Sequence, residues 1–115
     1  MTQSSTTGQE EWVSQLEQLT KDRQGQYVTI EILHPVYGDE PEAERLPLAY
    51  VAYDPKDDVV VIAVGGSTPK YPVVLRHLIW HPTEVDVDAD NGGLKVLERD
   101  GTTTITSFYR PVGQA

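Results

Sequence analysis

The stretch LPLAYVAYDPKDDVVVIAV, from Leu46 to Val64, decides the fold of this chain. Two apolar runs flank Asp54-Pro55, and aspartate followed by proline is favoured at the first two positions of a β-turn. The two runs are therefore predicted to pair as an antiparallel hairpin. The second run, residues 59–64, has no polar side chain, so we expect it to form the central and most buried strand.

Strand patterns continue on both sides of this hairpin. Upstream, YVTIEIL alternates and places Val28, Ile30 and Ile32 on one face. Downstream, VVLRHLIW lies between two prolines, and TEVDVD alternates with its valines inward and its acidic residues outward. LKVLER and TTTITSFY flank Asp100-Gly101, the strongest short hairpin signal. The segments HPVYGDEPEAER and GGSTPKYP, which separate these runs, are predicted to be loops.

One helix is expected to precede the strands. Trp12, Leu16 and Leu19 recur at helical spacing and Gly25 supplies a stop, so a helix is predicted over about residues 9–24. The chain shows no βαβ alternation, which excludes a doubly wound parallel sheet. We therefore expect an α+β, mainly β fold, in which six or seven short antiparallel strands form a curled sheet or a small barrel of the Sm-like or SH3-like kind.

The length and charge of the chain narrow its domain organisation and its partners. A chain of 115 residues fits one globular domain, predicted over residues 9–110 with flexible tails at 1–8 and 111–115. Eighteen acidic residues against nine Lys and Arg give a net charge of −9, which disfavours nucleic acid as a partner. Because the chain has no cysteine, no signal peptide and no membrane-spanning apolar run, a cytoplasmic protein without a membrane partner is expected.

The segment DVDADNGGLKVLE invites comparison with a calcium loop. Asp86, Asp88 and Asp90 take the first, third and fifth positions of an EF-hand loop. The sixth position is Asn91 where the motif needs glycine, and Glu98 arrives one place late. The flanks are strand-like rather than helical. A structural turn is therefore favoured, and a weak cation site of another type at these aspartates remains the alternative.

The remaining candidates are a surface patch and the histidines. Tyr71, Arg76 and Trp80 would form an aromatic and cationic interaction surface if they are exposed; otherwise Trp80 belongs to the core. His77 and His81 have helical ligand spacing, but on a strand four residues span about 13 Å, too far to share a metal ion. No set of nucleophile, base and acid is visible, so we expect neither an enzyme nor a bound cofactor.

Several stretches together carry a resemblance to a known family. VTIEIL, EAERLPL, YDPKDDVVVIAVGG, LRHLIWHPTEVDVD and DGTTTITSF resemble the bacterial domain-of-unknown-function family numbered 5335. The likeness runs from Trp12 to about Phe108 and rests on overall pattern and turn motifs rather than on a catalytic signature. The resemblance implies a small, stand-alone bacterial protein of unassigned activity, and it provides no catalytic residues.

The sequence therefore predicts a non-enzymatic binding or assembly module. Its partner would be an unidentified protein or further copies of the chain, because small β folds often join through the edges of their sheets. The alternative function is a metal-responsive or small-ligand-responsive protein that uses Asp86, Asp88 and Asp90. These two hypotheses differ in whether a sheet edge or an acidic turn makes the contact.

Overall fold

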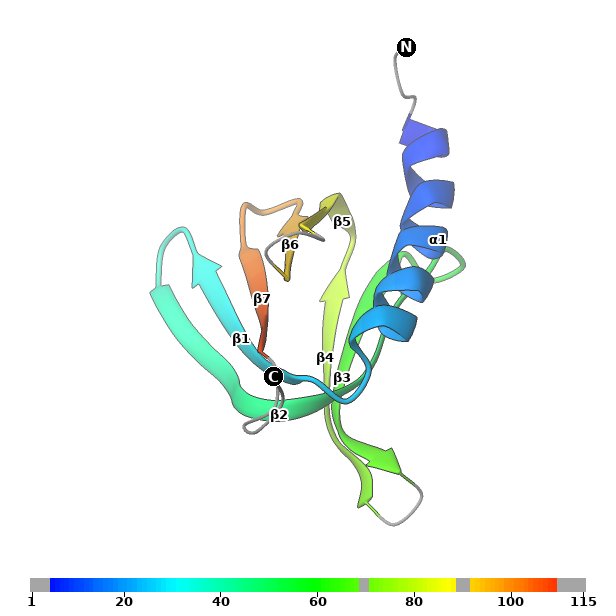
Figure 1. The fold of residues 1–115 in the computed structure, drawn as a ribbon. Coiled ribbons are helices and arrows are strands. Elements are labelled where there is room, and N and C mark those ends of the chain that lie inside the picture. Colours follow the sequence, from blue (N-terminus) through cyan, green and yellow to red (C-terminus); the bar gives the residue numbers. More distant parts are fainter. Residues whose placement is uncertain (1–4, 69–70, 89–91, 110–115) are drawn as a thin grey trace.

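The computed structural model describes residues 5–68, 71–88 and 92–109. Within these residues, one helix is followed by seven strands (Figure 1), as the sequence predicted. The elements are α1 (Ser5–Arg23), β1 (Tyr27–His34), β2 (Gly38–Asp54), β3 (Val59–Thr68), β4 (Tyr71–Trp80), β5 (Pro82–Asp88), β6 (Gly93–Glu98) and β7 (Thr103–Tyr109).

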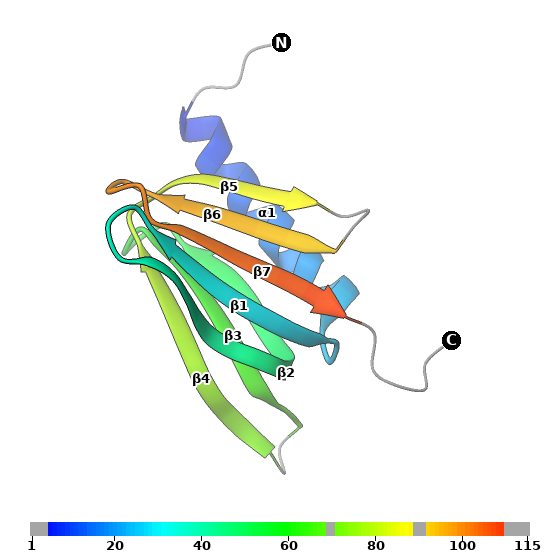
Figure 2. The same cartoon turned by 90° about the vertical axis from the view of Figure 1, so that its left-hand side faces the viewer.

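The strands form one antiparallel sheet in the order β4-β3-β2-β1-β7-β6-β5. The strands β4 and β5 are consecutive in the chain, yet they stand at opposite ends of this order. Figure 2 shows β5, β6, β7 and β1 side by side, with β3 and β4 running at an angle to them. Of the two packings that the sequence allowed, the structure has the curled sheet, because hydrogen bonding between the described strands does not close it into a barrel.

The two predicted hairpins are confirmed. The turn at Asp54-Pro55 joins β2 to β3, where Asp54 pairs with Val59, and the turn at Asp100-Gly101 joins β6 to β7. The helix begins at Ser5 instead of near residue 9, because the apolar spacing that predicted it locates the middle of a helix better than its first turn. Residues 1–4 and 110–115, which include parts of the predicted tails, lie outside the described residues.

Two predicted loops are largely strand. The segment HPVYGDEPEAER was expected to be a loop, but β2 begins at Gly38 and pairs with β1 up to Pro47. The backbone of β1 offers a partner strand to this stretch, and the shifts of register within the pairing accommodate its irregular sequence. Similarly, β3 continues to Thr68 and β4 begins at Tyr71, so that GGSTPKYP is mostly strand as well.

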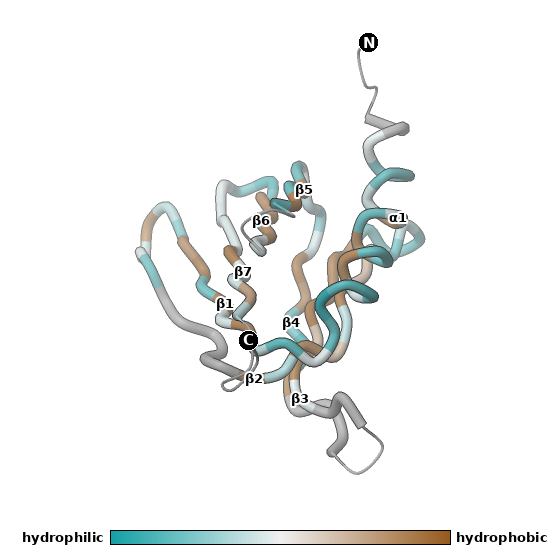
Figure 3. Tube along the Cα trace, viewed as in Figure 1, coloured by the Kyte–Doolittle hydropathy of each residue, from teal (hydrophilic) through white to brown (hydrophobic). Residues whose placement is uncertain are grey.

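The core lies between the sheet and helix α1. Figure 3 shows hydrophobic residues concentrated on the strands, while most of the described helix is hydrophilic. The helix nevertheless contributes the fully buried Leu16 and the nearly buried Leu19. The other members of the core come from β1 to β7: Val28, Ile30, Leu48, Val51, Tyr53, Val60, Ile62, Val64, Ile79, Val85, Leu94, Val96 and Phe108.

Helix α1 takes the place of a strand beside the second half of β2. The pairing of β2 with β1 ends at Pro47, which leaves the edge of the following residues to be covered. The hydroxyl of Thr20 accepts a hydrogen bond from the N–H of Val51 at 2.9 Å and lies 2.9 Å from its carbonyl oxygen. The side-chain amide of Gln24 donates to the carbonyl of Ala49 at 3.0 Å. The helix thus satisfies strand groups that would otherwise be exposed to competing strands.

We predict that Thr20→Val lowers the free energy of unfolding by about 1–3 kcal/mol, because valine keeps the shape and leaves the polar groups of Val51 without a partner. Urea denaturation followed by circular dichroism measures this loss. The control is Ser14→Ala, an exposed position on the same helix, which should change stability by less than about 0.5 kcal/mol. A Thr20→Val protein as stable as the control would contradict the role assigned to the hydroxyl.

Candidate functional site

Strand β5 forms one end of the sheet. The direction in which its backbone N–H and carbonyl groups point can be derived from a hydrogen bond at the start of the ladder between β6 and β7. The N–H of Phe108 donates to the carbonyl of Gly92 at 2.9 Å, next to the paired residues Gly93 and Ser107. In an antiparallel ladder this bond marks Gly93 and Ser107 as a non-hydrogen-bonded pair. Successive pairs alternate, so the backbone groups of Lys95, two residues along β6, point toward β5 and not toward β7.

The open edge of β5 is therefore formed by its valines. Asp86 pairs with Lys95, so the N–H and carbonyl of Asp86 are directed to β6. The alternation then directs the backbone groups of Val85 and Val87 away from β6. In the described part of the chain β5 pairs with β6 and with no other strand. Val85 and Val87 thus present two N–H groups and two carbonyls to a strand that would lie alongside β5.

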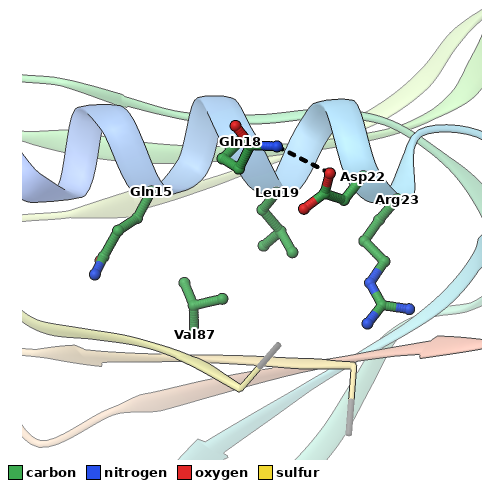
Figure 4. A pocket seen from close by; sticks show the side chains of 6 residues that line it. All are labelled: Gln15, Gln18, Leu19, Asp22, Arg23 and Val87. Carbon is green, nitrogen blue, oxygen red and sulfur yellow. Dashed lines mark hydrogen bonds between the residues drawn. The ribbon is translucent and has the colours of Figure 1, made fainter. Parts of the chain in front are cut away.

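A groove lies beside this edge, between β5 and helix α1 (Figure 4). Its volume is about 350 Å³, which is within the range of ligand sites. The side chain of Val87 faces Leu19 across the groove and gives it an apolar floor. The residues that line the groove are Gln15, Gln18, Leu19, Asp22, Arg23 and Val87.

The helix side of the groove carries polar side chains, two of which are joined by a hydrogen bond. The amide of Gln18 donates a hydrogen bond to Oδ1 of Asp22 at 2.9 Å. At the far end, the guanidinium of Arg23 lies over the ring of Phe108, 5.9 Å from its centroid, and Nη1 donates to Oε1 of Gln26 at 3.3 Å. The groove therefore combines an apolar floor with one wall of hydrogen-bonding groups, a composition typical of binding sites.

Two other hollows on the surface are less suited to a ligand. One of about 440 Å³ lies between α1 and β2, next to Thr20 and Val51, where the strand edge is already covered by the helix. The second, of about 160 Å³, lies by His34 and Tyr37. There Nδ1 of His34 accepts hydrogen bonds from the N–H groups of Val36 and Tyr37, so this histidine holds its own turn together.

Two of the three aspartates of the alternative cation site lie on strand β5. Asp86 and Asp88 are exposed on the outer face of β5, as the alternation predicted, together with Glu84. Asp90 lies outside the described residues. Among the residues that the structure describes, no three His, Cys, Asp or Glu side chains are grouped so as to hold a metal ion. Calcium binding at these aspartates thus stays a prediction.

The predicted interaction surface on β4 is exposed where the structure describes its side chains. Trp80 is 49% exposed, and Arg76 is exposed with its Nε donating to the hydroxyl of Tyr50 at 3.2 Å. The side chain of Tyr71 lies outside the described residues. Leu78, which the sequence analysis did not select, lies between the other two on the same face and is 44% exposed. Its position midway between Arg76 and Trp80 was the signal that could have identified it.

A second polar cluster joins the turn before β3 to the corner between β4 and β5. The hydroxyl of Tyr53 donates to Oδ1 of Asp58 at 2.7 Å, and Nδ1 of His81 lies 3.1 Å from Oδ2 of the same carboxylate. Asp58 and His81 both have a φ of 55°, which is unusual for residues other than glycine. The ring of Trp12 meets that of Tyr53 edge-on at 5.1 Å. The members of this cluster follow no motif, so the sequence does not predict their contact.

The electrostatics of the cluster favour an ionised Asp58 beside a neutral tyrosine. The hydrogen bond from Tyr53 is the largest influence that lowers the pKa of Asp58, and His81 acts in the same direction. Burial, together with the carboxylate of Asp58, raises the pKa of Tyr53 to about 12. These bonds hold two strained residues in place and connect three segments of the chain, so we assign the cluster a structural role.

Comparison with known proteins identifies relatives without an assigned activity. The model of a family described as a family of unknown function, DUF5335, matches residues 3–114. The chain is 32% identical over 99 residues to an uncharacterised protein of Aquifex aeolicus (strain VF5), a match that covers 84% of this chain and 83% of the relative. No solved structure matches the chain significantly.

We predict that Asp58→Asn lowers stability at neutral pH and flattens its acid dependence. Asp58 has a lowered pKa in the folded state, so its contribution is complete above the unfolded value of 3.8 and is lost as the pH falls through the lower folded value. Asparagine tolerates the positive φ, which confines the change to the charge. Urea denaturation between pH 7 and about pH 2 should show a deficit of roughly 1 kcal/mol that shrinks on acidification.

The matched control for this prediction is Asp57→Asn, in the same turn but exposed. Its stability should follow that of the unmodified protein at every pH. A deficit for Asp58→Asn that stays constant down to the lowest pH would show that the carboxylate's charge is not what the cluster uses.

Proposed function

This chain belongs to DUF5335, a family of unknown function, and we propose that it is a non-enzymatic binding module that holds an extended peptide as an added strand on β5. The observation that carries the proposal is the open backbone of Val85 and Val87 beside a groove of about 350 Å³. Strand addition to an open sheet edge is a common mode of peptide recognition, in which backbone hydrogen bonds provide affinity and side-chain pockets provide specificity.

The direction of the side chains specifies which peptide fits. Ligand residues opposite Val85 and Val87 would share their face of the sheet and enter the groove toward Leu19, so they should be apolar. The residues between them would project outward beside Glu84 and Asp86, which are exposed. Opposite charges on neighbouring strands attract, so these outward residues should be lysine or arginine. The preferred ligand is an extended segment in which apolar and basic residues alternate.

The net charge of the chain supports a basic partner. A net charge of −9 attracts basic segments and increases their rate of association. Among the described residues no helix is long and apolar enough to cross a membrane. Since the chain has no cysteine, we extend the proposal to a partner in the reducing cytoplasm.

The first test uses a synthetic peptide of alternating valine and lysine, with acetylated and amidated ends. In a strand paired antiparallel with β5, which is the orientation we propose, the valine amides face the protein and the lysine amides face solvent. Isothermal titration calorimetry should therefore detect binding of the plain peptide and of a version N-methylated at the lysines. N-methylation at the valines should abolish binding, because it removes the donors to Val85 and Val87. Equal binding of both methylated peptides would contradict strand addition.

The second test reverses one charge at the edge of β5. We predict that Glu84→Lys weakens binding of the same peptide by between about twofold and thirtyfold, the equivalent of one attractive cross-strand pair replaced by a repulsive one. Asp57→Lys is the control, since it makes the same change of net charge in the exposed turn between β2 and β3. If both variants weakened peptide binding equally, the loss would be due to the change in net charge alone. That result would overturn the assignment of the site to the edge of β5.

A further inference from the structure

The other end of the sheet, strand β4, has a different edge. The N–H of His81 donates to the carbonyl of Asp58 at 2.8 Å, next to the paired residues Val59 and Trp80. This bond identifies Val59 and Trp80 as a non-hydrogen-bonded pair, and the following pairs alternate. Ile79 therefore directs its backbone groups to β3, whereas Trp80 directs its own away from β3.

The alternation gives the open edge of β4 three consecutive positions. Arg76, Leu78 and Trp80 direct their N–H and carbonyl groups away from β3, and in the described part of the chain β4 pairs with β3 alone. The same three residues place their side chains on the outer face, where Leu78 is 44% and Trp80 is 49% exposed. Backbone groups and apolar side chains thus coincide along one edge. Figure 2 shows β4 at the border of the sheet.

The charge of this edge distinguishes it from the edge of β5 at the other end of the sheet. The chain carries eighteen acidic residues, but none lies between Tyr71 and Trp80, the limits of β4. Arg76 gives this strand a positive charge. Two molecules with a net charge of −9 repel each other, and the repulsion is smallest where carboxylates are absent. Of the two strands at the ends of the sheet, β5 carries three acidic residues and β4 carries none, so β4 is the end through which two copies can approach more easily.

We propose that β4 pairs antiparallel with β4 of a second copy, around a two-fold axis at Leu78. In this register Leu78 lies opposite its own counterpart. Arg76 then lies opposite Trp80 of the second copy, and the reverse. Two cation–π contacts flank the central leucine pair when each exposed guanidinium turns to the indole ring from the hydroxyl of Tyr50, to which its Nε donates at 3.2 Å. All three positions are hydrogen-bonded pairs, which agrees with the outward direction of their backbone groups. A two-fold interface has to be self-complementary in this way.

Two prolines limit the interface and separate it from the edge of β5. Pro72 and Pro82 bracket the pairing segment, and proline cannot donate to a ladder, so the joined strands end there. Self-association through β5 is disfavoured, because pairing two β5 strands would place Glu84 and Asp86 beside the same residues of the second copy. The inference about β4 is thus independent of the peptide site on β5.

The association state of the full chain tests this inference. Sedimentation equilibrium should give a dimer in concentrated solution, and Leu78→Glu should raise the dissociation constant at least about tenfold by placing two carboxylates at the centre. Val36→Glu is the matched control, an equal charge change at a residue that is 77% exposed on the turn between β1 and β2, and it should leave the dimer intact. A monomer at millimolar concentration, or a Leu78→Glu protein as dimeric as the control, would overturn the proposal and leave the patch to a different protein.

The register has a separate test, since the chain has no cysteine of its own. Facing residues of a hydrogen-bonded antiparallel pair have Cα atoms about 5.5 Å apart, a distance that a disulfide bridges. Leu78→Cys should therefore form a covalent dimer rapidly under mild oxidation, and faster than Val36→Cys at equal concentration. Equal rates for the two variants would exclude a two-fold axis at Leu78.

Discussion

The hydrogen bonds between the hydroxyl of Thr20 and the backbone of Val51 hold helix α1 against the stretch of β2 that β1 leaves uncovered. Every strand edge in a protein needs a partner, a cover or a means of protection. Strand β2 loses β1 as a partner at Pro47, and helix α1 covers the exposed stretch with Thr20 and Gln24. Because the helix is held against β2, it stands apart from β5, and the groove beside Val87 is the consequence.

The two remaining edges have opposite chemical character. The edge of β5 carries carboxylates on its outer face and has an apolar groove behind it, so it suits a basic extended peptide. The edge of β4 has no carboxylate and presents Arg76, Leu78 and Trp80, so it suits a second copy of an otherwise acidic chain. The same fold can in this way direct a peptide ligand to β5 and a second copy of the chain to β4. The carboxylates of β5 repel a second acidic chain, and β4 has no carboxylate to attract a basic peptide.

The sequence predicted those features that depend on neighbouring residues. The turns at Asp54-Pro55 and Asp100-Gly101 follow from local backbone preferences, and the alternation of β5 identified the outward position of Asp86. The first half of β2 was missed, because its strand character depends on β1, which precedes it across the turn. The contact of Tyr53 with Asp58 and His81 was missed as well, since only the bend between β4 and β5 brings His81 to that carboxylate. The open edges could not be inferred, because they require the strand order.

The most direct measurement is hydrogen exchange of individual backbone amides by NMR in dilute solution without ligand. We expect slow exchange at Val51, whose N–H is held by Thr20, and at Asp86, whose N–H is directed to β6. Exchange at Val85 and Val87 should be faster than at Asp86 by several orders of magnitude, because their amides face the open edge. Protection at Val85 and Val87 equal to that of Asp86 would show that the edge of β5 is covered, and would contradict the binding site derived from it.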